Sequence, residues 1–243
     1  MSGPSDPSDA VVEIRLHDDA AEMRRIAALF DQVWGAAVPL VNVELARAIA
    51  HSGGYVATIA VDGQVVGGSL GFLARHRGAP ALHSHLTGML PGVRGTGLGA
   101  QLKQHQRTWA AEQGLEWVTW TFDPLVRRNA RFNLRVLGAE VDDYLVDFYG
   151  PIDDAINARG ESDRLLVAWS TSSSPTDDAP RASTAAGGTV AVPTPDDIVA
   201  LRRTDRAGAD EWRLRLRREL GERLAAGGRV VSFSEDGEYV VVP

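Results

Sequence analysis

Residues 90–101, Leu-Pro-Gly-Val-Arg-Gly-Thr-Gly-Leu-Gly-Ala-Gln, decide the fold of this chain. Gly95, Gly97 and Gly99 follow an apolar stretch and begin a segment with the apolar spacing of a helix. Glycine lets the backbone approach a bulky anion closely, and the first amide groups of a helix then point toward that anion. The segment therefore predicts a binding site for a phosphate or pyrophosphate group.

Two common kinds of phosphate-binding loop do not match this segment. A P-loop ends in Gly-Lys-Ser/Thr, whereas Ala100 and Gln101 follow Gly99 here. A dinucleotide-binding fold has the spacing G-x-G-x-x-G in its first βαβ unit, whereas these glycines are spaced by two and lie in the middle of the chain. Coenzyme A, which carries a pyrophosphate, is the third candidate ligand.

The bulk composition is typical of a soluble globular protein, with 44% hydrophobic and 23% charged residues among 243. A formal net charge of −7 argues against a protein that coats nucleic acid or an anionic membrane. The chain has no cysteine, which excludes disulfides, thiolate metal sites and a cysteine nucleophile. No apolar run could span a bilayer and residues 1–9 lack the pattern of a signal peptide, so we expect a cytoplasmic location and no membrane partner.

Apolar periodicity and turn signals predict an α/β chain of the α+β type, with a mixed sheet and helices on its faces. Asp62-Gly63, between two runs typical of strands, predicts a hairpin. The expected elements are a strand at 11–16, helices at 19–34 and 43–51, strands at 55–61, 64–73 and 81–90, a helix at 97–113, a strand at 117–122, a helix at 125–137, and strands at 141–149 and 165–170.

The composition changes after this region. Residues 172–188 consist mainly of Ser, Thr, Pro, Ala, Asp and Gly, which predicts a flexible linker. Beyond the linker, nine arginines are balanced by ten acidic residues, so we expect no nucleic-acid partner there. The predicted organisation is a disordered tail (1–9), a main domain (10–171), the linker (172–188) and a small C-terminal α/β extension (189–243). The extension should contain helices at 195–204 and 208–226 and a hairpin of 230–233 with 239–242. We expect it to pack on the main domain or on a partner subunit.

The pattern Arg94-x-x-Gly97-x-Gly99 resembles the acyl-CoA pyrophosphate loop of the GNAT N-acetyltransferase superfamily. The order of elements from residue 11 to about 170 is also similar to that fold, over about two thirds of the chain. More narrowly, the chain resembles a bacterial group of GNAT enzymes that carry a similar C-terminal segment and of which some have been associated with N-acylation, including N-succinylation, of amino acids. The runs that carry this narrower resemblance are 83–88, 120–124, 129–133 and 162–164.

The resemblance implies that acetyl-CoA or another acyl-CoA is the cosubstrate. Backbone groups of the strand before the loop would meet the pantetheine arm, and backbone amides of residues 94–100 would surround the pyrophosphate, with the Arg94 side chain within reach of a phosphate oxygen. Helix 125–137 would supply a second contact with CoA, led by the Asn129 amide. The expected CoA-binding residues are Met89, Leu90, Arg94, Gly95, Thr96, Gly97, Leu98, Gly99, Ala100, Asn129, Phe132 and Asn133.

The proton donor of many GNAT enzymes is missing from this chain. Those enzymes carry a tyrosine four residues before the glycine that ends the second CoA-facing helix, and it protonates the departing CoA thiolate. Counting back from Gly138 gives Leu134, which has no proton to donate. Asn133 and Tyr149 are the alternative donors in the sequence.

The identity of the residue that removes a proton from the acceptor amine is also undecided. An imidazole suits this task because its pKa lies near 7. His83, His85 and Thr87 occupy alternate positions on one face of the predicted strand before the loop, and His85 is the best placed if that face lines the acceptor cleft. Either histidine could instead make only structural hydrogen bonds. Asp123 could pair with a cationic acceptor, orient a histidine, or serve as an ordinary turn acid before Pro124.

These features predict an N-acyltransferase that moves an acetyl or other short acyl group, such as succinyl, from acyl-CoA to a primary amine of a small molecule such as an amino acid. Because the chain has no cysteine, an acyl-thiol intermediate on the enzyme cannot form, which favours direct attack in a ternary complex. The alternative is a non-catalytic CoA-binding or regulatory domain, which Leu134 would suit. We expect no bound metal, and a homodimer is left open.

Overall fold

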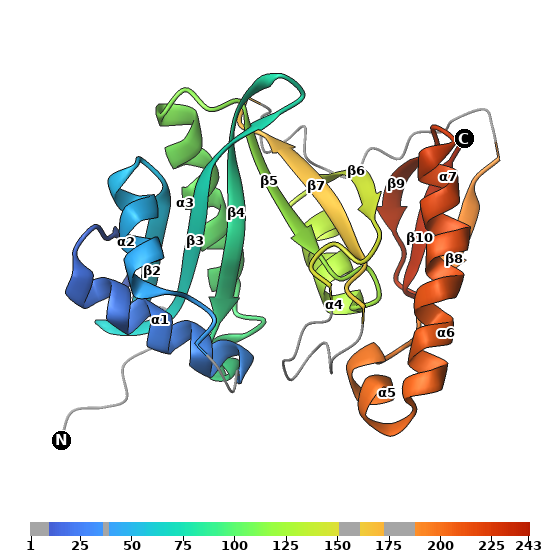
Figure 1. The fold of residues 1–243 in the computed structure, drawn as a ribbon, viewed down its shortest axis with the longest axis horizontal. Helices are drawn as coiled ribbons and strands as arrows, with labels where there is room; N and C mark the ends of the chain where they lie inside the picture. The colour runs from blue at the N-terminus through green and yellow to red at the C-terminus, as the bar shows by residue number, and fades with distance from the viewer. Residues whose placement is uncertain (1–9, 36–38, 151–160, 173–187) are drawn as a thin grey trace. The chain divides into compact units, whose positions relative to one another are not determined.

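The computed structural model of the protein describes residues 10–35, 39–150, 161–172 and 188–243 (Figure 1). The predicted tail (1–9) and nearly all of the predicted linker (172–188) lie outside the described residues. The chain forms two compact units, residues 1–115 and 116–243. None of the helices in the described ranges is long and apolar enough to cross a membrane.

The first unit is built on four antiparallel strands in the order β1-β2-β3-β4. The β2–β3 turn at Asp62 and Gly63 has positive φ at both residues, as a two-residue hairpin turn requires, and it confirms the predicted hairpin. Asp19 caps the first helix by accepting hydrogen bonds from the Ala21 and Glu22 amides. The elements are β1 (Val12–Leu16), α1 (Ala20–Trp34), α2 (Val43–His51), β2 (Tyr55–Val61), β3 (Gln64–His76), β4 (Ala79–Met89), the 3₁₀ turn η2 (Pro91–Val93) and α3 (Leu98–Glu112).

Helices α1 and α2 cover one face of this sheet and α3 covers the other. Leu70 of β3 packs with Phe30 of α1 in an apolar cluster. The next residue toward the N-terminus, Ser69, points to the opposite face, where its hydroxyl accepts a hydrogen bond from Gln106 of α3. The core of this unit therefore has an apolar side under α1 and a side with buried polar groups under α3.

Strand β4 departs from simple alternation. Its register against β3 shifts, so that Leu86 pairs with Leu70 while Ser84 pairs with Gly71, and His85 is the extra residue of a β-bulge. Thr87 and Ser84 consequently share a face, and their hydroxyl oxygens are 3.3 Å apart. The prediction that His83 and His85 share a face with Thr87 is wrong, because the bulge reverses the alternation between them.

The second unit contains two antiparallel sheets, β5-β7-β6 and β8-β10-β9. The predicted helix at 125–137 is a short α-helix that continues as a π-helical turn, and the predicted hairpin near the C-terminus is present with a third, unpredicted strand (β8) beside it. The elements are β5 (Trp117–Phe122), α4 (Arg127–Ala130), η3 (Arg131–Val136), β6 (Glu140–Leu145), β7 (Arg164–Ser170), β8 (Val190–Pro193), α5 (Ile198–Thr204), α6 (Arg206–Leu216), the π-helical turn η4 (Arg217–Gly221), α7 (Glu222–Ala225), β9 (Arg229–Phe233) and β10 (Glu238–Val242).

Candidate functional site

The glycine loop connects η2 to the N-terminus of α3 in the first unit. Gly95 and Gly97 have φ values of +83° and +89°, a conformation that residues with a side chain rarely adopt. A Cβ atom added at either position would have no protein atom within 4 Å. Glycine is therefore required here by the backbone conformation, and the space in front of the loop is open to a ligand.

The first amides of α3 are available to an anion. Gly97 is the N-cap of α3, and no side chain caps this helix. The Ala100 and Gln101 amides donate to the Gly97 carbonyl, whereas the amides of Leu98 and Gly99 have no hydrogen-bond partner within the described ranges. Unpaired amides at the positive end of a helix dipole favour an anionic ligand. This geometry suits a phosphate or pyrophosphate group.

Arg94 makes contacts other than the expected one with a phosphate. Its Nε donates to the Met89 carbonyl at 3.2 Å, and its Nη2 donates to the Val33 carbonyl near the end of α1 at 3.0 Å. Thr96 closes the loop by donating its hydroxyl to the Val93 carbonyl at 2.7 Å. In this structure the Arg94 side chain thus fixes the loop against β4 and α1.

The backbone of Leu90 is already used within the first unit. Its amide donates to the Val66 carbonyl at 2.8 Å, and its carbonyl accepts from the Val93 amide at 3.2 Å. Because hydrogen-bonding directions alternate along an antiparallel strand, the amide of Met89 points to the edge of β4 that faces away from β3. The expectation of free backbone groups therefore does not fit Leu90, whereas the amide of Met89 is not used in pairing with β3.

A lysine is buried under the loop helix. Lys103 of α3 is 3% exposed, and its Nζ donates to the Ser84 hydroxyl at 3.1 Å and to the Gln106 side-chain carbonyl at 2.8 Å. Burial lowers the pKa of Lys103 well below its usual value. Lys103 was not predicted as a site residue, although the spacing of Leu98 and Leu102 marks the buried face of the helix on which it lies.

His83 and His85 both lie against one aromatic ring. Their ring centroids are 5.2 and 5.9 Å from that of Phe72. Burial, with smaller contributions from His85 and Lys103, lowers the pKa of His83 to about 4. Burial also lowers the pKa of His85, which is the more exposed of the two histidines. Both imidazoles are therefore held in the neutral form, which is the form that can accept a proton.

In the second unit, the carboxylate of Asp123 is occupied by protein groups. One oxygen accepts the Leu125 amide at 2.9 Å, and the other lies 2.7 Å from the Arg202 guanidinium. Asp123 is 6% exposed. Of the three roles that the sequence left open, these contacts fit that of a turn acid best.

The predicted CoA-facing residues after β5 differ in their availability. Asn129, at the start of α4, is half-buried, and its side chain has no hydrogen-bond partner among the residues described. Asn133 is buried in η3, where its side-chain oxygen accepts from the Trp120 indole at 3.0 Å. Phe132 is partly buried in the same turn. Asn129 is thus the amide that can meet a ligand, while Asn133 supports Trp120.

Only one tyrosine offers an exposed hydroxyl group. All four tyrosines of the sequence are described, and Tyr55, Tyr144 and Tyr239 are buried with their hydroxyls bonded to His105, Asp163 and the Pro124 carbonyl. Tyr149 is 41% exposed, and its hydroxyl lies 3.1 Å from that of Thr121 near the carboxyl end of β5. Of the two alternative proton donors, Tyr149 is exposed and carries a hydroxyl, whereas Asn133 is buried.

No three His, Asp or Glu side chains of the described segments are grouped so that they could hold a metal ion. The first unit thus offers backbone amides suited to an anionic ligand and two neutral imidazoles, and the second unit offers the Asn129 amide and the Tyr149 phenol.

Residues 21–139 match the model of the acetyltransferase (GNAT) family. No curated protein sequence matches the chain. Similar solved structures include the ribosomal-protein-S18-alanine N-acetyltransferase of Escherichia coli, with a TM-score of 0.55 and 12% identity over 68% of this chain and 96% of that one.

Two further structures show the same fold. Arabidopsis thaliana Naa50, in complex with the bisubstrate analogue CoA-Ac-MVNAL, has a TM-score of 0.52 and 18% identity over 65% of this chain and 97% of that one. The yncA protein of Salmonella typhimurium, with its cofactor acetyl-CoA, has a TM-score of 0.53 and 16% identity over 68% of this chain and 96% of that one. Residues 21–139 thus match the acetyltransferase (GNAT) family, and the fold that these solved structures share extends over about two thirds of the chain.

Proposed function

We propose that the protein transfers an acetyl or other short acyl group, such as succinyl, from acyl-CoA to the primary amine of a small molecule such as an amino acid. The observation that carries this proposal is the pair of positive φ angles at Gly95 and Gly97 directly before the uncapped N-terminus of α3. This geometry lies inside the segment that matches the GNAT family. It supports a site for the pyrophosphate of CoA.

Backbone amides and one side-chain amide of the chain would bind the donor substrate, acyl-CoA. The amides of Leu98 and Gly99 would hold the pyrophosphate, and the amide of Met89 and the side chain of Asn129 would meet the pantetheine arm. When bound, acyl-CoA supplies the thioester carbon that an amine attacks. With no cysteine in the chain, the acyl group passes directly to that amine in a ternary complex.

Proton transfer is assigned to two residues. His85 accepts the proton that the acceptor ammonium must lose, because its imidazole is neutral and accessible. Tyr149 returns a proton to the CoA sulfur in place of Leu134, because it carries the one exposed phenol of the chain. Asp123 is left out of this assignment because Arg202 and the Leu125 amide occupy its carboxylate.

A non-catalytic CoA-binding domain is the second candidate function, and Leu134 is the observation that favours it. The full chain is titrated with acetyl-CoA and succinyl-CoA by calorimetry, then incubated with free amino acids, other small amines and a peptide bearing a free N-terminus while thiol release is followed. Thiol release that depends on one class of small amine supports the proposal. Tight CoA binding without turnover on any amine supports the non-catalytic alternative, turnover on the peptide alone moves the acceptor class to proteins, and absence of CoA binding overturns both functions.

A further inference from the structure

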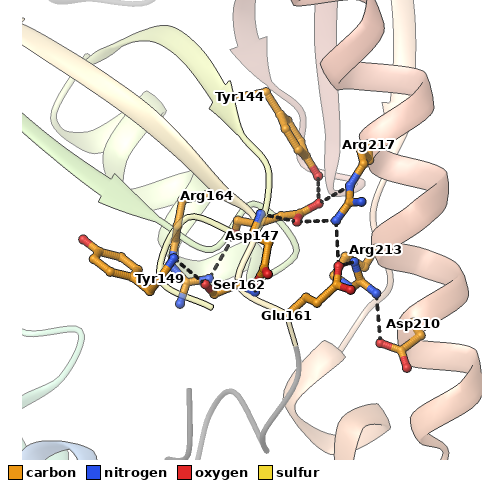
Figure 2. A network of polar contacts seen from close by, with 10 residues as sticks. Tyr144, Asp147, Tyr149, Glu161, Ser162, Arg164, Asp210, Arg213 and Arg217 are labelled. Carbon is orange, nitrogen blue, oxygen red and sulfur yellow. Dashed lines mark hydrogen bonds and ion pairs between the residues drawn. The ribbon is translucent and has the colours of Figure 1, made fainter. Parts of the chain in front are cut away.

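A network of charged and polar side chains joins the C-terminal helical segment (α6, η4 and α7, residues 206–225) to β6 and to residues 161–164 at the start of β7 (Figure 2). Its centre is the carboxylate of Asp163, which is 4% exposed. Arg217 of η4 donates to both carboxylate oxygens, from Nη2 at 2.7 Å and from Nε at 3.0 Å, and the Tyr144 hydroxyl donates at 2.8 Å. A two-pronged contact of this kind fixes orientation as well as distance.

The network continues from Asp163 to Tyr149 through three hydrogen bonds. Asp163 accepts the amide of Asp147 at 3.0 Å, and the Asp147 carboxylate accepts the amide of Ser162 at 2.9 Å. The Ser162 hydroxyl then accepts the amide of Tyr149 at 2.8 Å. The position of Tyr149 therefore depends, bond by bond, on a carboxylate that Arg217 holds.

Backbone strain at Asp147 strengthens the dependence of Tyr149 on this network. Asp147 has a φ of +45°, which is unfavourable for a residue with a side chain. Such a conformation persists only where its surroundings enforce it, and here the amide and the carboxylate of Asp147 are both held by the network. Loss of the network would release Asp147 and, two residues later, Tyr149.

Arg217 is the group that keeps Asp163 charged. Burial alone would raise the pKa of Asp163, but the hydrogen bonds from Arg217, the Asp147 amide and Tyr144 outweigh it and lower that pKa. A second carboxylate, Glu161, contacts Arg217 at 3.0 Å and also contacts Arg213. Removing the Arg217 guanidinium would leave the buried Asp163 without its main cation.

The phenol at the end of this network faces outward at the carboxyl end of β5. Its hydroxyl lies beside Thr121, and the Arg164 guanidinium lies 5.7 Å from the centre of its ring. This placement and the exposed hydroxyl point to contact with a substrate.

We propose that Arg217 is a positioning residue of the transferase, which holds Asp163 and thereby orients the phenol of Tyr149 for its role in the reaction. The inference rests on the proposed function. It makes the C-terminal helical segment part of the catalytic apparatus, although that segment lies outside the residues that match the GNAT family.

The kinetic test compares Arg217→Ala and Arg217→Lys with Arg215→Ala, whose side chain pairs with Glu219 on the same helical segment. We expect R217A and Tyr149→Phe each to lower kcat tenfold or more with KM for acyl-CoA within twofold, R217K to recover part of the loss, and R215A to stay within twofold of the wild type. In the double variant R217A/Y149F, kcat should be no lower than in Y149F alone, because both changes remove the same contribution. Fully multiplicative losses in the double variant, or an unchanged kcat in folded R217A, would overturn the proposal.

A spectroscopic readout separates this inference from the proposed function. Protein labelled with 3-fluorotyrosine should give four ¹⁹F signals, since the chain has four tyrosines, and Y149F identifies the signal of Tyr149. We expect R217A and Ser162→Ala to move that signal, and R215A to leave it in place, whether or not any amine is turned over. If circular dichroism shows that R217A does not fold, S162A is the deciding variant, because it removes only the contact to the Tyr149 amide. An unmoved Tyr149 signal in S162A would overturn the inference.

Discussion

The guanidinium of Arg202 lies 2.7 Å from the carboxylate of Asp123, and the two side chains are only 12% and 7% exposed. The pair joins α5 to the turn between β5 and α4, which are 79 positions apart in sequence. A buried ion pair adds little compared with a well-packed apolar pair, but removal of one partner leaves a buried charge without compensation. Asp123 and Arg202 are therefore needed together.

Replacing Arg202 by Ala should destabilise the protein by about 3–5 kcal/mol, the usual cost of leaving one buried charge unpaired. Urea unfolding followed by circular dichroism measures the change. Arg203→Ala, at the exposed next position of α5, is the control and should shift the free energy of unfolding by less than about 1 kcal/mol. If Asp123→Asn instead kept full stability and lost more than a hundredfold in kcat, Asp123 would regain a catalytic role.

Gly97→Leu should abolish CoA binding at a modest cost in stability. The change puts a side chain into the open space before α3 and forces a residue with a Cβ to adopt φ near +89°, which costs about 1–2 kcal/mol. Gly63→Leu is a matched control, because Gly63 also has positive φ and open space around its added Cβ but lies in the β2–β3 turn. Calorimetry should show CoA affinity reduced at least a hundredfold in G97L and within twofold of wild type in G63L. Equal affinities in the two variants would remove the loop from the CoA site.

The pH profile of the activity should have an acid limb, a fall in kcat/KM at low pH, that disappears when His85 is replaced. Because burial lowers the pKa of His85 from 6.5, the imidazole stays neutral until the pH falls below that value, and kcat/KM should decline only there. His85→Gln should lower kcat about a hundredfold or more and flatten this limb, as expected for loss of a general base. His83→Gln should keep the limb. A profile in which the limb disappears with His83 and survives the loss of His85 would transfer the role to His83.

Local signals in the sequence predict much of the first unit and of the loop. Asp19 caps α1, Asp62-Gly63 forms the hairpin turn, and Gly97 begins α3, because each of these features depends on the conformational preference of one or two residues. The family resemblance, carried by the same loop, agrees with the match to the GNAT family over residues 21–139.

The parts that sequence reasoning did not predict depend on contacts between distant residues. Nothing near Asp123 indicates that Arg202 will occupy its carboxylate, and nothing near Arg94 indicates that it will bond to Val33. The bulge at His85 is set by the register of β3 against β4, which apolar spacing within one strand cannot report. These are tertiary effects, and they decide which candidate site residues remain available.

Lys103 is the only lysine in the sequence, which allows its burial to be measured without interference from other lysines. Its pKa is lowered in the folded protein, so between that pKa and 10.5 the unfolded chain binds more protons than the folded one, and stability should rise with pH across this window. Lys103→Met should remove this rise, which is at most about 1.4 kcal/mol per pH unit. In protein labelled with ¹³C-lysine, a single signal should titrate well below 10.5 in the fold and near 10.5 in urea. A native signal that titrates near 10.5, or an amine reagent that labels Lys103 as fast in the folded as in the unfolded protein, would show that the amine is not buried under α3.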